Sequence, residues 1–149
     1  MKKSLLFAII TVLFGVYWLR SEPQSDDIAF NRIWLSHLPQ HERDKFSLIA
    51  FINDDKVGVF QESSAFQGNY DIFTYSGKNG AVTINMLQDG KKSSATYTAS
   101  KCEVKNFDYC LEIKGAPRGP VRYYSQKDWV IESAVEAQAL AQKIATHAE

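Results

Sequence analysis

Between Lys45 and Ile131 the chain consists of short strand-like segments joined by turn sequences, and this pattern narrows the possible folds more than any other feature of the sequence. The segments are rich in Val, Ile, Thr, Tyr and Phe, and the breaks contain the turn residues Asn, Asp, Gly and Pro. The breaks are too short for a parallel crossover, so neighbouring segments are expected to pair antiparallel. Seven strands are predicted, at residues 45–52, 56–61, 69–75, 81–87, 93–104, 108–114 and 121–125, with 128–131 as a possible eighth.

An antiparallel meander of this length protects its edges best by curling up on itself. We therefore expect a mainly β fold, an up-and-down meander of 7–8 strands closed or half-closed into a barrel, with a short helix at each end. The N-terminal helix is predicted from DDIAFNRIWLSHLP, where apolar residues at positions 30, 33, 34 and 38 lie on one helical face. The C-terminal helix is predicted from SAVEAQALAQKIATHAE, in which Ser133 and Glu136 form a capping box.

Residues 1–25 have the layout of a secretory leader, with two lysines, an apolar run over residues 5–19 and a polar linker. As a helix the run would span roughly 22 Å, less than the ~30 Å hydrocarbon core of a bilayer, which favours a cleaved signal peptide. However, no A-x-A-like cleavage site follows the run, and Tyr17 and Trp18 suit the membrane interface of an uncleaved signal anchor. Both alternatives stay open.

The lysines of the leader precede its apolar run, so the positive-inside rule places the amino end in the cytoplasm and the single domain, residues 26–149, across the membrane. The MKK start is typical of bacterial leaders. The expected location is therefore the periplasmic side of the inner membrane, anchored through residues 5–19, or the periplasm or exterior if the leader is cleaved.

The chain has two cysteines, Cys102 and Cys110, on either side of a predicted turn at Asn106. In an oxidising compartment a disulfide is expected, and two thiols with no histidine nearby cannot complete a tetrahedral zinc site. In a regular hairpin centred on Asn106 the two cysteines would lie directly opposite each other. Alternation, however, puts Cys110 on the outer face of 108–114 and Cys102 on the inner face of 93–104. Either a bulge changes the phase of one strand or the cysteines do not face each other.

Charge and motifs exclude several classes of function. The 149-residue chain has a net charge of zero, and without its leader about −2, so a nucleic-acid partner is not expected. His37 and His41 are separated by Pro39, which breaks any helix that would bring them together as metal ligands. Neither a nucleophile elbow nor a phosphate-binding loop occurs. We predict no cofactor, no metal and no enzymatic activity.

A leading helix that carries Trp34, an antiparallel meander and a trailing helix together resemble the lipocalin and fatty-acid-binding (calycin) barrels over residues 28–147. The segments NRIWLSHLP, GNYDIFTY and RYYSQKDW also resemble a group of small exported bacterial proteins of uncharacterised function. The resemblance to calycins implies binding of small hydrophobic ligands.

Aromatic residues make up 13% of the chain, more than a thin two-layer core requires. In a barrel, rings such as Phe51, Phe73 and Tyr97 are expected to line a cavity for a small apolar or amphipathic ligand. The alternative is that the rings fill the interior, and that the domain is an envelope module that docks a protein partner. The sequence leaves both functions open.

Overall fold

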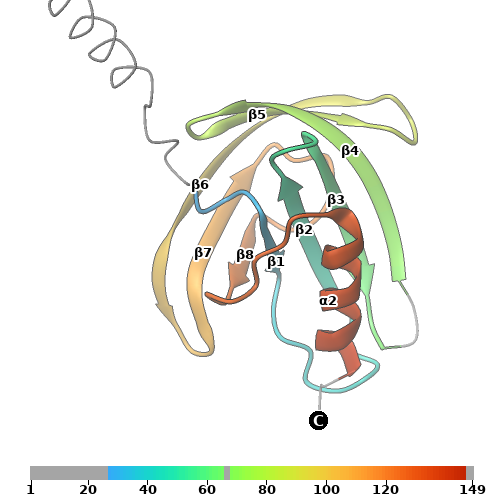
Figure 1. Cartoon of the computed structure of the whole chain (residues 1–149), viewed down its shortest axis with the longest axis vertical. Coiled ribbons are helices and arrows are strands. Elements are labelled where there is room, and N and C mark those ends of the chain that lie inside the picture. The colour runs from blue at the N-terminus through green and yellow to red at the C-terminus, as the bar shows by residue number, and fades with distance from the viewer. Residues whose placement is uncertain (1–26, 66–67, 147–149) are drawn as a thin grey trace, which may run out of the picture.

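The computed structural model describes residues 27–65 and 68–146, which form eight antiparallel strands closed into a barrel and one helix on its outside (Figure 1). The strands follow one another around the barrel in sequence order, and the last pairs with the first. The elements are β1 (Arg32–Leu35), β2 (Phe46–Ile52), β3 (Val57–Ser63), β4 (Gly68–Lys78), β5 (Ala81–Met86), β6 (Lys92–Val104), β7 (Phe107–Lys114), β8 (Arg122–Ser125) and α2 (Ala134–Thr146). The predicted up-and-down β-barrel is confirmed.

The predicted leader, residues 1–25, lies outside the residues that the structure describes. Within the described ranges, no helix has both the length and the apolar character needed to cross a membrane.

The prediction of an N-terminal helix is wrong, because the segment with Trp34 forms strand β1. Asn31, just before it, has a φ of 52°, a left-handed conformation that a right-handed helix cannot contain. Trp34 belongs to the cluster inside the barrel and its two neighbours to the cluster outside it, so β1 is buried on both faces and lacks the alternation of a half-buried strand. The barrel takes its eighth strand from here and not from 128–131, where Val130 makes a single bridge to Arg32.

Arg32 reinforces the seam between β1 and β8, which share a single register pair, Leu35 with Tyr124. The Arg32 guanidinium donates a hydrogen bond from Nη1 to the carbonyl oxygen of Gln126 at 2.5 Å and lies 4.5 Å from the ring centre of Tyr109 on β7. Burial lowers the pKa of Arg32, yet an arginine stays charged in proteins. This buried cation therefore links three strands where the backbone ladder is shortest.

Alternation along the strands divides the buried side chains into two clusters. The inner cluster fills much of the barrel and consists of Ala29, Trp34, Ile49, Phe51, Phe60, Phe73, Tyr75, Val82, Ile84, Met86, Ala95, Tyr97, Leu111, Ile113 and Tyr123. The outer cluster lies between the backs of β1 to β3 and α2 (Figure 1). There α2 buries Ala137, Ala141 and Ala145, whose small side chains let the helix approach the sheet closely.

The capping box predicted at the start of α2 is confirmed. The Glu136 amide donates to the Ser133 hydroxyl at 3.2 Å, and the Glu132 amide donates to the Glu136 carboxylate at 2.8 Å. One of the first amide groups of the helix and the amide of Glu132, just before the cap, are thereby satisfied, which fixes where the helix begins.

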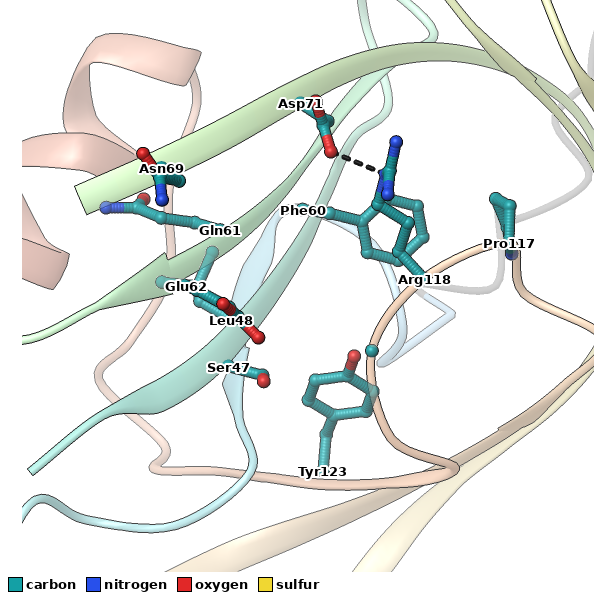
Figure 2. Close-up of a pocket in the computed structure, with 11 residues that line it drawn as sticks. Ser47, Leu48, Phe60, Gln61, Glu62, Asn69, Asp71, Pro117, Arg118 and Tyr123 are labelled. Atoms are coloured by element: carbon teal, nitrogen blue, oxygen red, sulfur yellow. Dashed lines mark ion pairs between the residues drawn. The ribbon is translucent and has the colours of Figure 1, made fainter.

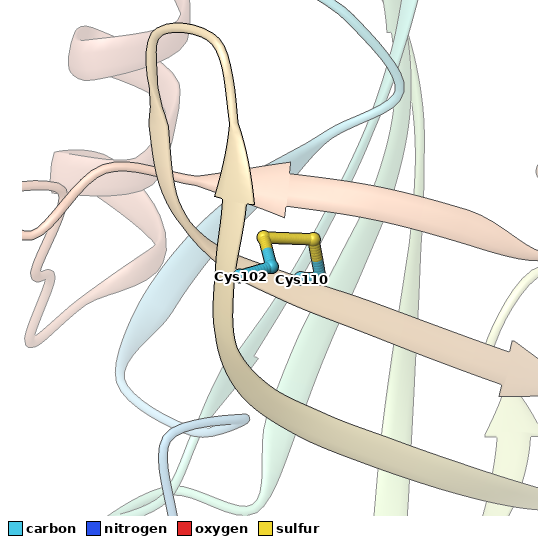
Figure 3. Close-up of a disulfide and its surroundings, with 2 residues drawn as sticks. All are labelled: Cys102 and Cys110. Atoms are coloured by element: carbon cyan, nitrogen blue, oxygen red, sulfur yellow. A yellow bond between two sulfur atoms is a disulfide. The ribbon is translucent and has the colours of Figure 1, made fainter.

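The hairpin of β6 and β7 brings Cys102 and Cys110 to disulfide-bonding distance, with their Cα atoms 5.6 Å apart (Figure 3). The hairpin is not the regular one in which the two cysteines would lie directly opposite each other, because Ser100 faces Cys110 in the ladder. A register shift between Lys101 and Val104 displaces the end of β6 relative to β7. This bulge resolves the conflict in alternation, since it turns Cys102 toward Cys110 while the rest of β7 keeps its inward residues.

Candidate functional site

A cavity of about 370 Å³ lies at one end of the barrel, between the start of β2, the hairpin of β3 and β4, and the loop that joins β7 to β8 (Figure 2). This volume is at the lower end of the range for small-molecule sites, ~300 to 1,000 Å³. The cavity is lined by Ser47, Leu48, Phe60, Gln61, Glu62, Asn69, Asp71, Pro117, Arg118, Gly119 and Tyr123.

The strand register explains why polar groups gather at this end. Directly paired residues of antiparallel strands point to the same face, and Ser47, Glu62 and Asn69 form one such row across β2, β3 and β4. The next row deeper in the barrel contains Phe60 and Asp71. Polar character therefore increases from the middle of the barrel toward the mouth of the cavity.

The other end of the interior is filled by aromatic rings. Phe51 lies edge-on to Phe73 and to Tyr75, with ring centres 5.6 Å and 5.2 Å away, and Phe30 from the preceding turn stacks on Tyr75 at 5.5 Å. Gly58 makes room for these rings, because a Cβ atom there would lie 2.2 Å from the Phe73 ring. A missing side chain on β3 thus allows the aromatic packing of this half.

The three residues predicted to line a ligand site, Phe51, Phe73 and Tyr97, lie in this filled half. Tyr97 contacts Phe30 with ring centres 5.7 Å apart, and its hydroxyl donates to the carboxylate of Asp27. Burial, together with that carboxylate, raises the pKa of Tyr97 to about 12. The structure therefore brings the three residues into one cluster, but the lining of the cavity does not include them. Their part in ligand binding stays a prediction.

Tyr123 on β8 supplies the most deeply buried polar group of the cavity wall. The residue is 0% exposed, and its hydroxyl has no hydrogen-bond partner in the described part of the chain. Burial raises the pKa of Tyr123 above its ordinary value, so the hydroxyl is neutral and can donate or accept. Because a buried polar group without a partner costs about 1 to 3 kcal/mol, a molecule in the cavity that bonds to this hydroxyl would gain affinity.

The loop between β7 and β8 closes one side of the cavity through two neighbouring residues. Gly119 has a φ of 78°, and a Cβ atom there would lie 2.0 Å from the Tyr123 hydroxyl, so glycine lets the loop approach the ring. Arg118 forms an ion pair with Asp71 on β4, with Nε and Oδ2 2.5 Å apart (Figure 2). Both side chains are partly exposed, so the pair adds less than ~1 kcal/mol to stability. Its main effect is to hold the loop across the mouth.

Sequence reasoning did not find this cavity, because its lining comes from segments that are distant in the chain. Asn69, Asp71 and Tyr123 lie in the segments GNYDIFTY and RYYSQKDW, but nothing in the sequence indicated that these segments meet Phe60 and Glu62 at one cavity. One signal was available in GAPRGP, at residues 115–120, where two glycines and two prolines indicate a loop of defined shape.

Neither metal chemistry nor a known family defines the site. Among residues 27–65 and 68–146, no three His, Cys, Asp or Glu side chains gather as a metal site would require, and His37 contacts Asp44 at 3.4 Å. Comparison of the chain with protein families, with curated proteins and with solved structures returns no match. The closed eight-stranded barrel agrees with the architecture of calycins, and the geometry provides a cavity with an apolar wall and a polar mouth.

Proposed function

We propose that this protein is an exported or membrane-anchored β-barrel that binds a small amphipathic ligand in the cavity at the end of its barrel, without catalysis. One observation carries the proposal: Tyr123, a fully buried residue whose hydroxyl has no partner among the described residues, belongs to the lining of a cavity of about 370 Å³. Leu48, Phe60 and Pro117 provide apolar surface beside it, and polar side chains surround the mouth. This combination suits a ligand with an apolar body and one polar group.

The proposed location is the periplasmic side of the inner membrane, with residues 5–19 as an anchor, or the periplasm or exterior after cleavage. The leader sequence supports export. The approach of Cys102 and Cys110 supports an oxidising compartment, because disulfides persist there. The barrel architecture also supports a lipocalin-like or fatty-acid-binding-like role, in which a closed barrel holds a small molecule.

Two tyrosines make a matched test of ligand binding. Tyr75 and Tyr123 both carry a buried hydroxyl without a partner in the described part of the chain, but of the two only Tyr123 belongs to the lining of the cavity. The full chain is expressed with export and examined by native mass spectrometry before and after organic extraction. We expect extra mass that disappears on extraction, unchanged in Tyr75→Phe and reduced at least about threefold in Tyr123→Phe, because the latter loses a hydrogen bond worth about 1 kcal/mol. A bare polypeptide mass in all three proteins would contradict the proposal.

A second function is favoured by the filled half of the interior. The packed rings around Phe51 and Phe73 are the core that a purely structural barrel would have. A barrel of this kind would serve as an envelope module that docks a protein partner through its outer face or α2. The absence of any bound small molecule, together with crosslinking of the exported chain to one envelope protein, would support this alternative.

A further inference from the structure

We infer that the ligand of the cavity carries a positively charged group, such as an amine, on a small apolar or aromatic body. The inference rests on the proposed function and narrows the ligand to one chemical class. It follows from the charges and the hydrogen-bonding groups that line the cavity.

The charged side chains of the lining leave one negative charge uncompensated. These side chains are Glu62, Asp71 and Arg118. Arg118 and Asp71 are 2.5 Å apart and neutralise each other. The carboxylate of Glu62 has no ion pair or side-chain hydrogen bond within the ranges 27–65 and 68–146. A carboxylate ligand would therefore face repulsion at the mouth, whereas a cation would be attracted there.

The neutral groups of the lining also suit a cation. Ser47 and Asn69 lie in the same row as Glu62, and each has an oxygen that can accept a hydrogen bond from an ammonium group. Tyr123, whose buried hydroxyl has no partner among the described residues, belongs to the same lining. The aromatic faces of Phe60 and Tyr123 attract cations as well as apolar groups. One small amine could therefore reach a carboxylate, neutral acceptors and a ring within a single cavity.

Three probes of similar size and different charge test the inference. They are phenethylamine, 3-phenylpropionamide and 3-phenylpropionate, and their binding to the extracted full chain is measured by calorimetry. We expect the amine to bind most tightly and the carboxylate most weakly. Glu62→Gln should weaken binding of the amine about threefold to tenfold and leave binding of the amide unchanged.

Two further variants separate a local effect from a general change in charge. Glu103→Gln removes the same charge from the exposed hairpin of β6 and β7 and should leave all three affinities unchanged. Arg118→Gln frees Asp71 from its ion pair, so it should strengthen binding of the amine. If Arg118 instead serves as an anion receptor, the same substitution would abolish binding of the carboxylate.

The outcomes distinguish this inference from the proposed function. Tightest binding by the carboxylate, with loss in Arg118→Gln, would overturn the inference and leave the cavity as a ligand site. Failure of all three probes, while a mass that depends on Tyr123 still co-purifies, would also overturn the charge assignment alone. Failure of the probes without any co-purifying mass would overturn both.

Discussion

The two ends of the barrel interior bury the same kind of group in different surroundings. Tyr75 and Tyr123 both have a buried hydroxyl with no partner among the described residues. The ring of Tyr75 is enclosed by Phe30 and Phe51, with ring centres 5.5 Å and 5.2 Å away, whereas Tyr123 borders a cavity of about 370 Å³. Burial of a polar atom alone therefore does not indicate a binding site. A buried polar group on a residue that belongs to the lining of a cavity is a better candidate, because a ligand in the cavity would lie next to that residue.

The largest expected effect is a loss of stability, and it should differ between two neighbouring phenylalanines, one in the filled half of the interior and one in the wall of the cavity. Phe73 belongs to the filled half, and Phe60, 4.7 Å away between ring centres, also lines the cavity. Phe73→Ala should lower the free energy of unfolding by about 3 to 5 kcal/mol, since it leaves a hole among packed rings. Phe60→Ala should cost about 1 kcal/mol less, because part of its ring already faces open space. Urea denaturation of both variants measures the difference, and a larger loss for Phe60→Ala would contradict the division.

The cysteine pair lies outside both the filled half and the cavity, so its removal should change stability without changing ligand binding. Replacing both Cys102 and Cys110 by serine should lower the free energy of unfolding by about 2 to 3 kcal/mol, the value expected for a crosslink that closes a short loop. Ligand occupancy of the folded protein should not change, because neither cysteine lines the cavity. Thiol titration of the exported wild-type protein in denaturant provides the control, and two reactive thiols would refute the disulfide.

A smaller effect tests the wall of the cavity. Gly119→Ala should cost about 2 kcal/mol, because strain at its φ of 78° adds to a clash with the Tyr123 hydroxyl, 2.0 Å from the new Cβ. Gly90→Ala is the matched control: its φ is 67°, but nothing lies within 4 Å of a Cβ there, so we expect about 1 kcal/mol.

The clash component can be isolated by removing the hydroxyl. In Gly119→Ala combined with Tyr123→Phe, the nearest remaining ring atom is Cζ, 3.3 Å from the new Cβ. Gly119→Ala should lose more free energy of unfolding than Gly90→Ala, and the double variant should recover most of this difference. Thermal or urea unfolding measures it. Simple additivity of the two substitutions would mean that Gly119 does not contact Tyr123 in solution.

Local patterns in the sequence were enough to predict the meander, the positions of seven strands and the capping box at Ser133. They failed at β1, because the apolar residues around a short strand buried on both faces can have the spacing expected of a helix. The left-handed backbone of Asn31 is also not evident from the sequence. They also could not fix how Cys102 and Cys110 meet, because a bulge is a departure from the alternation on which strand prediction depends.

The cavity is harder to predict than the fold for a different reason. The ion pair of Arg118 and Asp71 joins the loop between β7 and β8 to strand β4, and only closure of the barrel brings them together. Likewise, the choice of Phe51, Phe73 and Tyr97 as ligand-lining residues followed from their inward direction, which the structure supports. Direction alone does not tell which inward rings meet other rings and which border open space.

The most direct test of the division is an NMR measurement of magnetisation transfer from non-protein hydrogens to the rings of Tyr75 and Tyr123. A ligand in the cavity lies beside Tyr123, which belongs to the lining, so the ring protons of Tyr123 should show transfer from ligand hydrogens, while those of Tyr75, which lies outside the lining, should show none. Transfer to both rings, or to Tyr75 alone, would mean that the interior is not divided into a filled half and an open half. Transfer to neither ring would mean that the cavity is closed in solution.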